Sequence, residues 1–286
     1  RGDYEGAIAD FNKVIKLTPN NAEAYCMRGD VMCSQQEYDA ALADYNRAIE
    51  LDSGVEAAYM GRGSVLMAKG DYDGAILDYT KAIELSPKSA LAYHNRGVAR
   101  WNRGDYDGAI KDYSTALGLN PNYAEAYYNR GNAYYRKGDF EKAIKDFNKA
   151  LRLNPKHPEA YNNRGLAKAK KDEYEEAIRD YDKAIELKPN YAEAYHNRGL
   201  ARYSKRRYES AIADFKKACE LNPKNALSWY LLARAYTKVN DKDRALVALK
   251  KAFDMDTTGR LLKERAKDDP DFESLREEEE FKLHYY

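Results

Sequence analysis

The chain has 286 residues, and its 48 Lys and Arg residues nearly balance its 47 Asp and Glu, for a net charge of +1. This balance argues against a protein dedicated to duplex nucleic acid, which carries a clear basic excess. No run of apolar residues is long enough to cross a bilayer, so we expect no membrane insertion. Three cysteines cannot form a disulfide framework, and as free thiols they fit a reducing compartment.

The aliphatic content of the chain is unusually low. Leu, Ile, Val and Phe together number 48, a share that raises the suspicion of disorder, although the balanced charge argues the other way. The remaining apolar volume must come from the 41 Ala and 26 Tyr residues. The distribution of these residues therefore decides whether the chain folds.

The Tyr and Ala residues recur at a fixed period. One aromatic position repeats every 34 residues without insertion or deletion, at Tyr25, Tyr59, Tyr93, Tyr127, Tyr161, Tyr195 and Trp229. An alanine position keeps the same step, at Ala41, Ala75, Ala109, Ala143, Ala177, Ala211 and Ala245. A period of this size predicts a solenoid, in which each unit buries its apolar face against its neighbours.

One unit reads as two helices joined by a turn. A first helix begins at Ala124, and a second helix is predicted over 140–153 with Ala143 and Phe147 on its inner face. The Lys137-Gly138-Asp139 segment separates the two helices, and Asn154-Pro155 ends the second.

The repeating Tyr/Trp, Gly, Ala, Tyr/Phe, Ala and Pro pattern resembles that of tetratricopeptide repeat proteins over roughly residues 2–258. The resemblance implies an all-α fold, a right-handed superhelical solenoid of antiparallel helix pairs whose first helices line a concave groove. We expect a truncated repeat with only its second helix at 1–21, six full repeats at 22–225 and an atypical terminal repeat at 226–259. Residues 260–286 are expected to form a charged C-terminal helical cap.

An Arg recurs at a position of the first helix that faces inward, where the family usually has an aliphatic residue. Because a half-buried guanidinium needs an acceptor, we expect each Arg to pair with an Asp of the second helix in its own repeat. The seventh repeat supports this pairing, since it replaces both partners together, with Leu232 and Ala248. The predicted pairs are Arg28–Asp44, Arg62–Asp78, Arg96–Asp112, Arg130–Asp146, Arg164–Asp180 and Arg198–Asp214. A charged ligand-binding ladder is the alternative interpretation.

Four consecutive repeats place Asn on the opposite face of the first helix, at Asn95, Asn129, Asn163 and Asn197. An amide both donates and accepts, so such a series can hold a peptide main chain without recognising its side chains. The series resembles the asparagine ladder in the tetratricopeptide arm of the O-linked N-acetylglucosamine transferases. Recent duplication of one repeat would produce the same pattern without any role in binding.

Further polar and aromatic residues share this arc and complete the predicted peptide-binding groove. They are His94, Trp101, Tyr128, Asn132, Tyr135, Arg136, Asn162, Lys170, His196 and Tyr203. Exposed aromatic residues beside polar groups favour a binding surface. Packing between adjacent first helices is the alternative explanation for them.

The sequence therefore predicts a non-enzymatic scaffold that binds an extended peptide or protein segment in the groove. The alternatives are a pocket for a hydrophobic small molecule or lipid, and a substrate-recruiting arm of a larger enzyme. No catalytic, metal-binding or cofactor-binding constellation is apparent. The truncated first repeat raises self-association as a further prediction.

Overall fold

The computed structural model describes residues 4–257, 261–278 and 281, and every regular element within these ranges is helical. Contacts divide the chain into two compact units, residues 1–139 and 140–286. Residues 260, 279–280 and 282–286 of the predicted cap lie outside the described residues.

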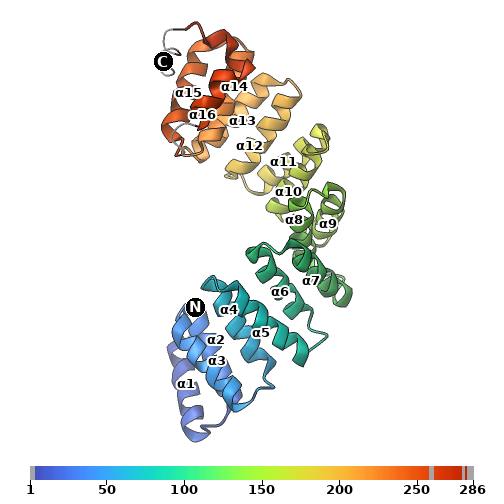
Figure 1. Ribbon diagram of the computed structural model, residues 1–286, viewed down its shortest axis with the longest axis vertical. Helices are drawn as coiled ribbons and strands as arrows, with labels where there is room; N and C mark the ends of the chain where they lie inside the picture. The colour runs from blue at the N-terminus through green and yellow to red at the C-terminus, as the bar shows by residue number, and fades with distance from the viewer. Residues whose placement is uncertain (1–3, 258–260, 279–280, 282–286) are drawn as a thin grey trace. The chain divides into compact units, whose positions relative to one another are not determined.

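Consecutive helices pack against each other within each unit, and Figure 1 shows them stacked side by side. The first unit contains α1 (Tyr4–Leu17), α2 (Ala22–Ser34), α3 (Tyr38–Leu51), α4 (Glu56–Ala68), α5 (Tyr72–Leu85), α6 (Ala90–Arg103), α7 (Tyr106–Leu119) and α8 (Ala124–Arg136). The second contains α9 (Phe140–Leu153), α10 (Pro158–Ala169), α11 (Tyr174–Leu187), α12 (Ala192–Ser204), α13 (Tyr208–Leu221), α14 (Ala226–Lys238), α15 (Lys242–Met255), α16 (Leu261–Asp268) and the 3-10 helix η1 (Pro270–Leu275). The predicted all-α solenoid of helix pairs is confirmed.

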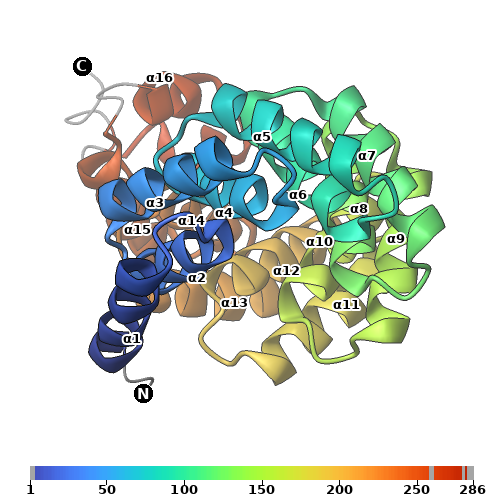
Figure 2. The ribbon, with the colours of Figure 1, turned by 90° about the horizontal axis from the view of Figure 1, so that it is seen from below.

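The first described helix, α1, packs against α2, and Figure 2 shows it at the end of the first unit. No residue of α1 is buried, and its Leu17 is 81% exposed. Self-association through this helix stays a prediction, as does the division into repeats.

The turn inside each helix pair requires a left-handed backbone. The residue at this position has φ between 58° and 89° in all seven pairs, at Gln36, Gly70, Gly104, Gly138, Asp172, Arg206 and Asn240. Glycine adopts this conformation without steric cost, whereas the other residues lose on the order of 1 kcal/mol. The position in the repeat therefore imposes this conformation whatever residue stands there. Gly104 and the two equivalent glycines adopt it without backbone strain.

Close packing between the paired helices depends on a glycine in the first and a ring in the second. A Cβ atom on Gly97 would lie 2.7 Å from Cε1 of Tyr113, closer than any real contact. The seventh repeat has Ala233 and Leu249 at these two positions, and both are buried. The added methyl group is accommodated because the ring is absent.

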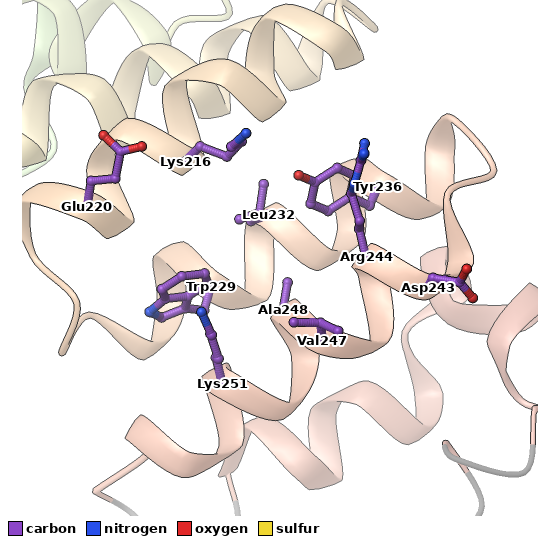
Figure 3. Close-up of a pocket in the computed structure, with 10 residues that line it drawn as sticks. All are labelled: Lys216, Glu220, Trp229, Leu232, Tyr236, Asp243, Arg244, Val247, Ala248 and Lys251. Carbon is purple, nitrogen blue, oxygen red and sulfur yellow. The ribbon is translucent and has the colours of Figure 1, made fainter.

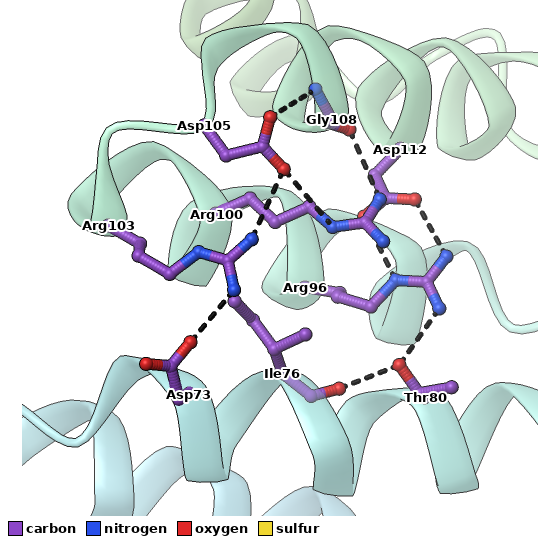
Figure 4. Close-up of polar contacts among 9 residues, drawn as sticks. All are labelled: Asp73, Ile76, Thr80, Arg96, Arg100, Arg103, Asp105, Gly108 and Asp112. Atoms are coloured by element: carbon purple, nitrogen blue, oxygen red, sulfur yellow. Dashed lines mark hydrogen bonds and ion pairs between the residues drawn. The ribbon is translucent and has the colours of Figure 1, made fainter.

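The arginine that recurs in the first helices joins three helices. Arg96 of α6 donates from Nε and Nη2 to the two oxygens of Asp112 on α7, at 2.9 and 2.8 Å (Figure 4). Its third nitrogen, Nη1, donates to Oγ1 of Thr80 on α5 at 3.0 Å. The guanidinium carbon also lies 5.6 Å from the centre of the Tyr93 ring, within the range of a cation–π contact. Arg96 thus fixes the preceding second helix, its own second helix and its own aromatic residue together.

The same arrangement recurs along both units. Bidentate contacts join Arg28–Asp44, Arg62–Asp78, Arg164–Asp180 and Arg198–Asp214, in addition to Arg96–Asp112. The five aspartates are between 2% and 5% exposed, so these carboxylates are satisfied inside the protein. This burial disfavours the alternative of a charged ligand-binding ladder. Arg130 and Asp146 belong to different units, and their pairing stays a prediction.

The second unit ends in a capping segment, Asp269–Leu275, whose helix η1 packs against α14. Oδ2 of Asp271 accepts from Tyr203 Oη at 2.5 Å and from Arg234 Nε at 2.7 Å, and the other oxygen contacts Lys238. Tyr230 donates from Oη to Oδ2 of Asp269 at 2.7 Å. Its ring contacts the Phe272 ring edge-on, with 5.3 Å between the ring centres. The segment is therefore held by two carboxylates and one ring.

The environment of Asp271 favours its charged form. Burial opposes ionisation, but Lys238, Tyr203 and Arg234 together outweigh it, and the pKa of Asp271 lies below its ordinary value of 3.8. A carboxyl with a lowered pKa in the folded state contributes stability above its unfolded pKa and loses it as the pH falls through the folded pKa.

A first prediction concerns the arginine pairs. We expect Arg62→Leu to lower the free energy of unfolding by about 3 kcal/mol, because Asp78 would remain buried without its cation. Arg96→Leu should cost less, because Arg100 still contacts Asp112 at 2.8 Å. Urea titration followed by circular dichroism measures both. The double variant Arg62→Leu/Asp78→Ala copies the seventh repeat and should recover most of the loss. Equal losses for the two single variants would contradict the role given to Arg100.

A second prediction concerns the capping segment. Asp271→Asn should lower the melting temperature at pH 7 by about 3 °C, because the amide loses the ion pairs with Arg234 and Lys238. The difference from the unmodified chain should shrink as the pH falls below 3.8. Differential scanning calorimetry across the pH range tests this. Asp73→Asn is the control, because its ion pair with Arg103 is exposed and contributes little. A difference that stays constant down to low pH would rule out the charge of Asp271 as its cause.

Candidate functional site

Part of the predicted groove is buried rather than exposed. His94 is 4% exposed, Asn162 is fully buried and Asn197 is 9% exposed. The expectation that these residues lie on an open arc is therefore wrong. The physical reason is that His94 and Asn162 point toward the next first helix in the stack, and that helix covers them.

His94 of α6 is bonded to two residues further along the first unit. Asn129 of α8 donates from Nδ2 to Nε2 of His94, with 3.0 Å between the nitrogens, and Tyr123 Oη lies 3.1 Å from Nδ1. Burial lowers the pKa of His94, although Glu125 opposes the shift. The imidazole is therefore neutral at pH 7, and the amide of Asn129 links α6 to α8.

The second unit repeats this link with different residues. Asn197 donates from Nδ2 to Oδ1 of Asn162 at 2.9 Å, and Asn162 in turn donates to Oδ1 of Asn163 at 3.2 Å. His196 contacts Ser228 Oγ at 2.8 Å, and burial lowers its pKa. In both units an asparagine of the predicted ladder contacts the residue 35 positions earlier. The Nδ2 groups of Asn129 and Asn197 thus form hydrogen bonds to the preceding first helix.

A cavity of about 250 Å³ opens between α6 and α8 in the first unit. We call it the α6–α8 site, and it is lined by Val98, Trp101, Asn102, Tyr113, Asn129 and Asn132. Trp101 lies half-buried against Tyr106, with 4.9 Å between the ring centres. Three residues predicted from the sequence, Trp101, Asn129 and Asn132, thus meet in one cavity, where Asn102 adds a third amide beside the indole.

The other predicted residues lie in four settings. Tyr128, Tyr135 and the exposed Arg136 are on α8, beside the α6–α8 site in sequence, and burial raises the pKa of Tyr135. Asn95 on α6 contacts Nδ1 of His94 at 3.4 Å. Lys170 is exposed at the end of α10 in the second unit, and Tyr203 is covered by the capping segment.

A second cavity, of about 360 Å³, lies where the seventh repeat meets the sixth, between α13, α14 and α15. Figure 3 shows the residues that line it: Lys216, Glu220, Trp229, Leu232, Tyr236, Asp243, Arg244, Val247, Ala248 and Lys251. We call this the lateral cavity. Leu232 and Ala248, which replace the paired Arg and Asp of the other repeats, form its buried floor.

The lateral cavity lies at the position of the arginine site. The equivalent cavity two repeats earlier, of about 570 Å³, is lined by Asn148 and Arg164, and the Arg164 guanidinium donates to Asn148 there. In the seventh repeat an apolar floor replaces it. Lys251 lies 4.4 Å from the centre of the Trp229 indole at the rim. The sequence showed that the seventh repeat loses the Arg–Asp pair, but the cavity was not predicted from it. The joint replacement by Leu232 and Ala248 was the sequence feature that could have indicated the cavity.

Neither a membrane span nor a metal site is found among the described residues. No described helix is both long and apolar enough to cross a membrane. Within the same residues, no group of three or more His, Cys, Asp or Glu side chains could hold a metal ion. The three cysteines are free thiols, and burial raises the pKa of Cys26 to about 12, so its thiol is a poor nucleophile.

Comparison with known families covers most of the chain. Family models described as tetratricopeptide repeat match residues 94–158, 129–192, 192–225 and 215–247. A model described as TPR repeat matches residues 1–32, 29–70 and 63–104. No curated protein matches the chain.

Solved structures give the same answer. YrrB, described as a TPR protein with an unusual peptide-binding site, is 29% identical with a TM-score of 0.58, over 65% of this chain and 96% of its own. A MamA protein is 32% identical with a TM-score of 0.55, over 60% of this chain and 94% of its own. A tetratricopeptide repeat protein from Parabacteroides merdae shares the fold at 22% identity and a TM-score of 0.65, over 93% and 99%. Since these repeat matches extend from residue 1 to residue 247, the chain belongs to the tetratricopeptide repeat family.

Proposed function

We propose that the chain is a non-enzymatic interaction scaffold that binds an extended segment of a partner protein at the α6–α8 site. The observation that carries this proposal is the cavity in which Trp101, Asn129 and Asn132 meet. An indole supplies a large apolar surface with one donor, and such residues dominate binding energy at interfaces. The similarity to YrrB supports a peptide as the ligand, since that protein of the same family is described as having a peptide-binding site.

The two asparagines of the site have different roles in this proposal. The Nδ2 group of Asn129 is used by His94, so Asn129 offers its amide oxygen to a ligand. Asn132 lies one helical turn further along α8 and also lines the cavity. Replacing Asn129 would loosen α6 from α8 as well as remove a ligand contact. The test therefore uses the two other predicted residues that line the cavity, Trp101 and Asn132.

The test of this proposal uses peptides selected from a random displayed library against the full chain. We expect Trp101→Ala and Asn132→Ala each to weaken binding of the selected peptides at least tenfold, which corresponds to about 1.4 kcal/mol. Fluorescence anisotropy with labelled synthetic peptides measures the dissociation constants.

The control for this test is Met67→Ala, at the position equivalent to Trp101 one repeat earlier. It removes a comparable side chain outside the site and should change affinity less than twofold. Selected peptides that bind all three variants equally would refute the proposal.

The lateral cavity favours a second candidate function, the binding of a hydrophobic small molecule. Its volume falls within the range of ligand pockets, and its floor of Leu232, Tyr236 and Ala248 is buried and largely apolar. The role of a recruiting arm within a larger enzyme has no comparable observation in its favour.

The small-molecule function predicts that an apolar dye such as anilinonaphthalene sulfonate binds the folded chain and becomes fluorescent. A triple variant should abolish the fluorescence, because Leu232→Arg, Ala248→Asp and Lys216→Asn together rebuild the arrangement of Arg28, Asp44 and Asn12. Helical content and melting temperature serve as the control for folding. Dye binding that is unchanged in a folded triple variant would exclude the lateral cavity.

A further inference from the structure

The capping segment contacts the last repeat through positions that the sequence assigns to the groove. Tyr203 lies on α12, and Tyr230, Arg234 and Lys238 lie at successive turns of α14. Together these four residues hold Asp269, Asp271 and Phe272. The second unit therefore contains a short acidic and aromatic segment already bound between two first helices.

The α6–α8 site and the adjoining residues of α8 provide the same four positions, three repeats earlier. Trp101, Tyr128, Asn132 and Arg136 each precede Tyr203, Tyr230, Arg234 and Lys238, in that order, by 102 residues. All four were predicted as groove residues, and Trp101 and Asn132 line the cavity. The correspondence holds in structure as well, since each set lies on one first helix and the next, α6 with α8 and α12 with α14.

The chemistry of the two sets is parallel. The Tyr203 hydroxyl that donates to Asp271 corresponds to the indole N–H of Trp101, and Lys238 corresponds to the exposed Arg136. The ring of Tyr230, which contacts Phe272 edge-on, corresponds to the ring of Tyr128. The two sets differ at one position, where the charged donor Arg234 corresponds to the neutral donor Asn132. The four positions of the first unit thus carry two N–H donors, one cation and one ring, a set whose chemistry matches an acidic and aromatic ligand.

We propose that the α6–α8 site binds a partner segment in which a carboxylate is followed directly by an aromatic residue, as Asp271 is followed by Phe272 in the capping segment. The carboxylate contacts Arg136, Asn132 and Trp101, and the aromatic ring packs against Tyr128. This inference rests on the proposed function and specifies the chemistry of the partner.

The test uses a fluorescein-labelled synthetic peptide with the sequence of residues 268–276, added to the full chain at physiological ionic strength. We expect binding that falls at least tenfold with Arg136→Glu and with replacement of either the aspartate or the phenylalanine that correspond to Asp271 and Phe272 in the peptide. Arg136→Lys should retain most of the affinity, because it keeps the charge.

A variant that is expected to bind the peptide more tightly provides a second test. Asn132→Arg recreates Arg234 and should tighten peptide binding at least fivefold. The matched control is Leu200→Arg, which adds the same charge at the equivalent position of α12, where Leu200 is exposed and Ser204 replaces the cation. Leu200→Arg should leave the affinity within twofold.

The remaining outcomes separate this inference from the proposed function. A peptide that binds without responding to Arg136 or Asn132 variants is displacing the capping segment or binding elsewhere, which overturns the inference. A peptide that binds neither the unmodified chain nor Asn132→Arg also overturns it. If library selection instead returns neutral or basic peptides that depend on Trp101, the proposed function stands and this inference fails. If no selected peptide depends on Trp101, both fail.

Discussion

The arginine of the first helix is the interaction on which the repeats depend. Before the last repeat, the core of the pairs is built mainly from Ala and a ring of the second helix, so apolar burial alone defines the positions of neighbouring helices weakly. A guanidinium has a fixed planar geometry, and Arg96 uses it to contact α5, α7 and the Tyr93 ring simultaneously. A buried ion pair contributes little net stability compared with apolar packing. We therefore infer that the main role of the ion pair is to fix the register in which each repeat packs against the next.

Periodicity predicts this framework well, and the comparison between repeats predicts its partners. The joint loss of Arg and Asp in the seventh repeat is enough to assign Arg28 to Asp44 from the sequence alone. The same reasoning fails for His94 and Asn162, which are buried. A helical period gives the direction of a side chain around its own helix. It does not show that Asn129, 35 residues later, covers that direction.

The seventh repeat differs through sets of substitutions rather than single ones. Ala233 is tolerated because Leu249 replaces the ring, and Leu232 with Ala248 exchanges an ion pair for an apolar cavity. Arg234 and Lys238 add the charges that hold Asp271. The contacts of Arg234 and Lys238 with Asp271 could not be predicted from the sequence, because the capping segment lies outside the 34-residue period and has no equivalent in the other repeats.

The capping segment allows the proposed site in the first unit to be compared with its equivalent in the last repeat. In the last repeat, Arg234 and Lys238 both face Asp271, and the segment is part of the same chain, so its effective concentration is high and the site stays filled. In the first unit, Asn132 replaces Arg234, so the proposed carboxylate site has one cation fewer, and we expect it to bind a carboxylate more weakly. A permanent internal contact needs the stronger version, whereas an interaction scaffold that exchanges partners needs the weaker one. The substitution of Asn132 for Arg234 is therefore consistent with a structural role at one end and reversible recognition at the other.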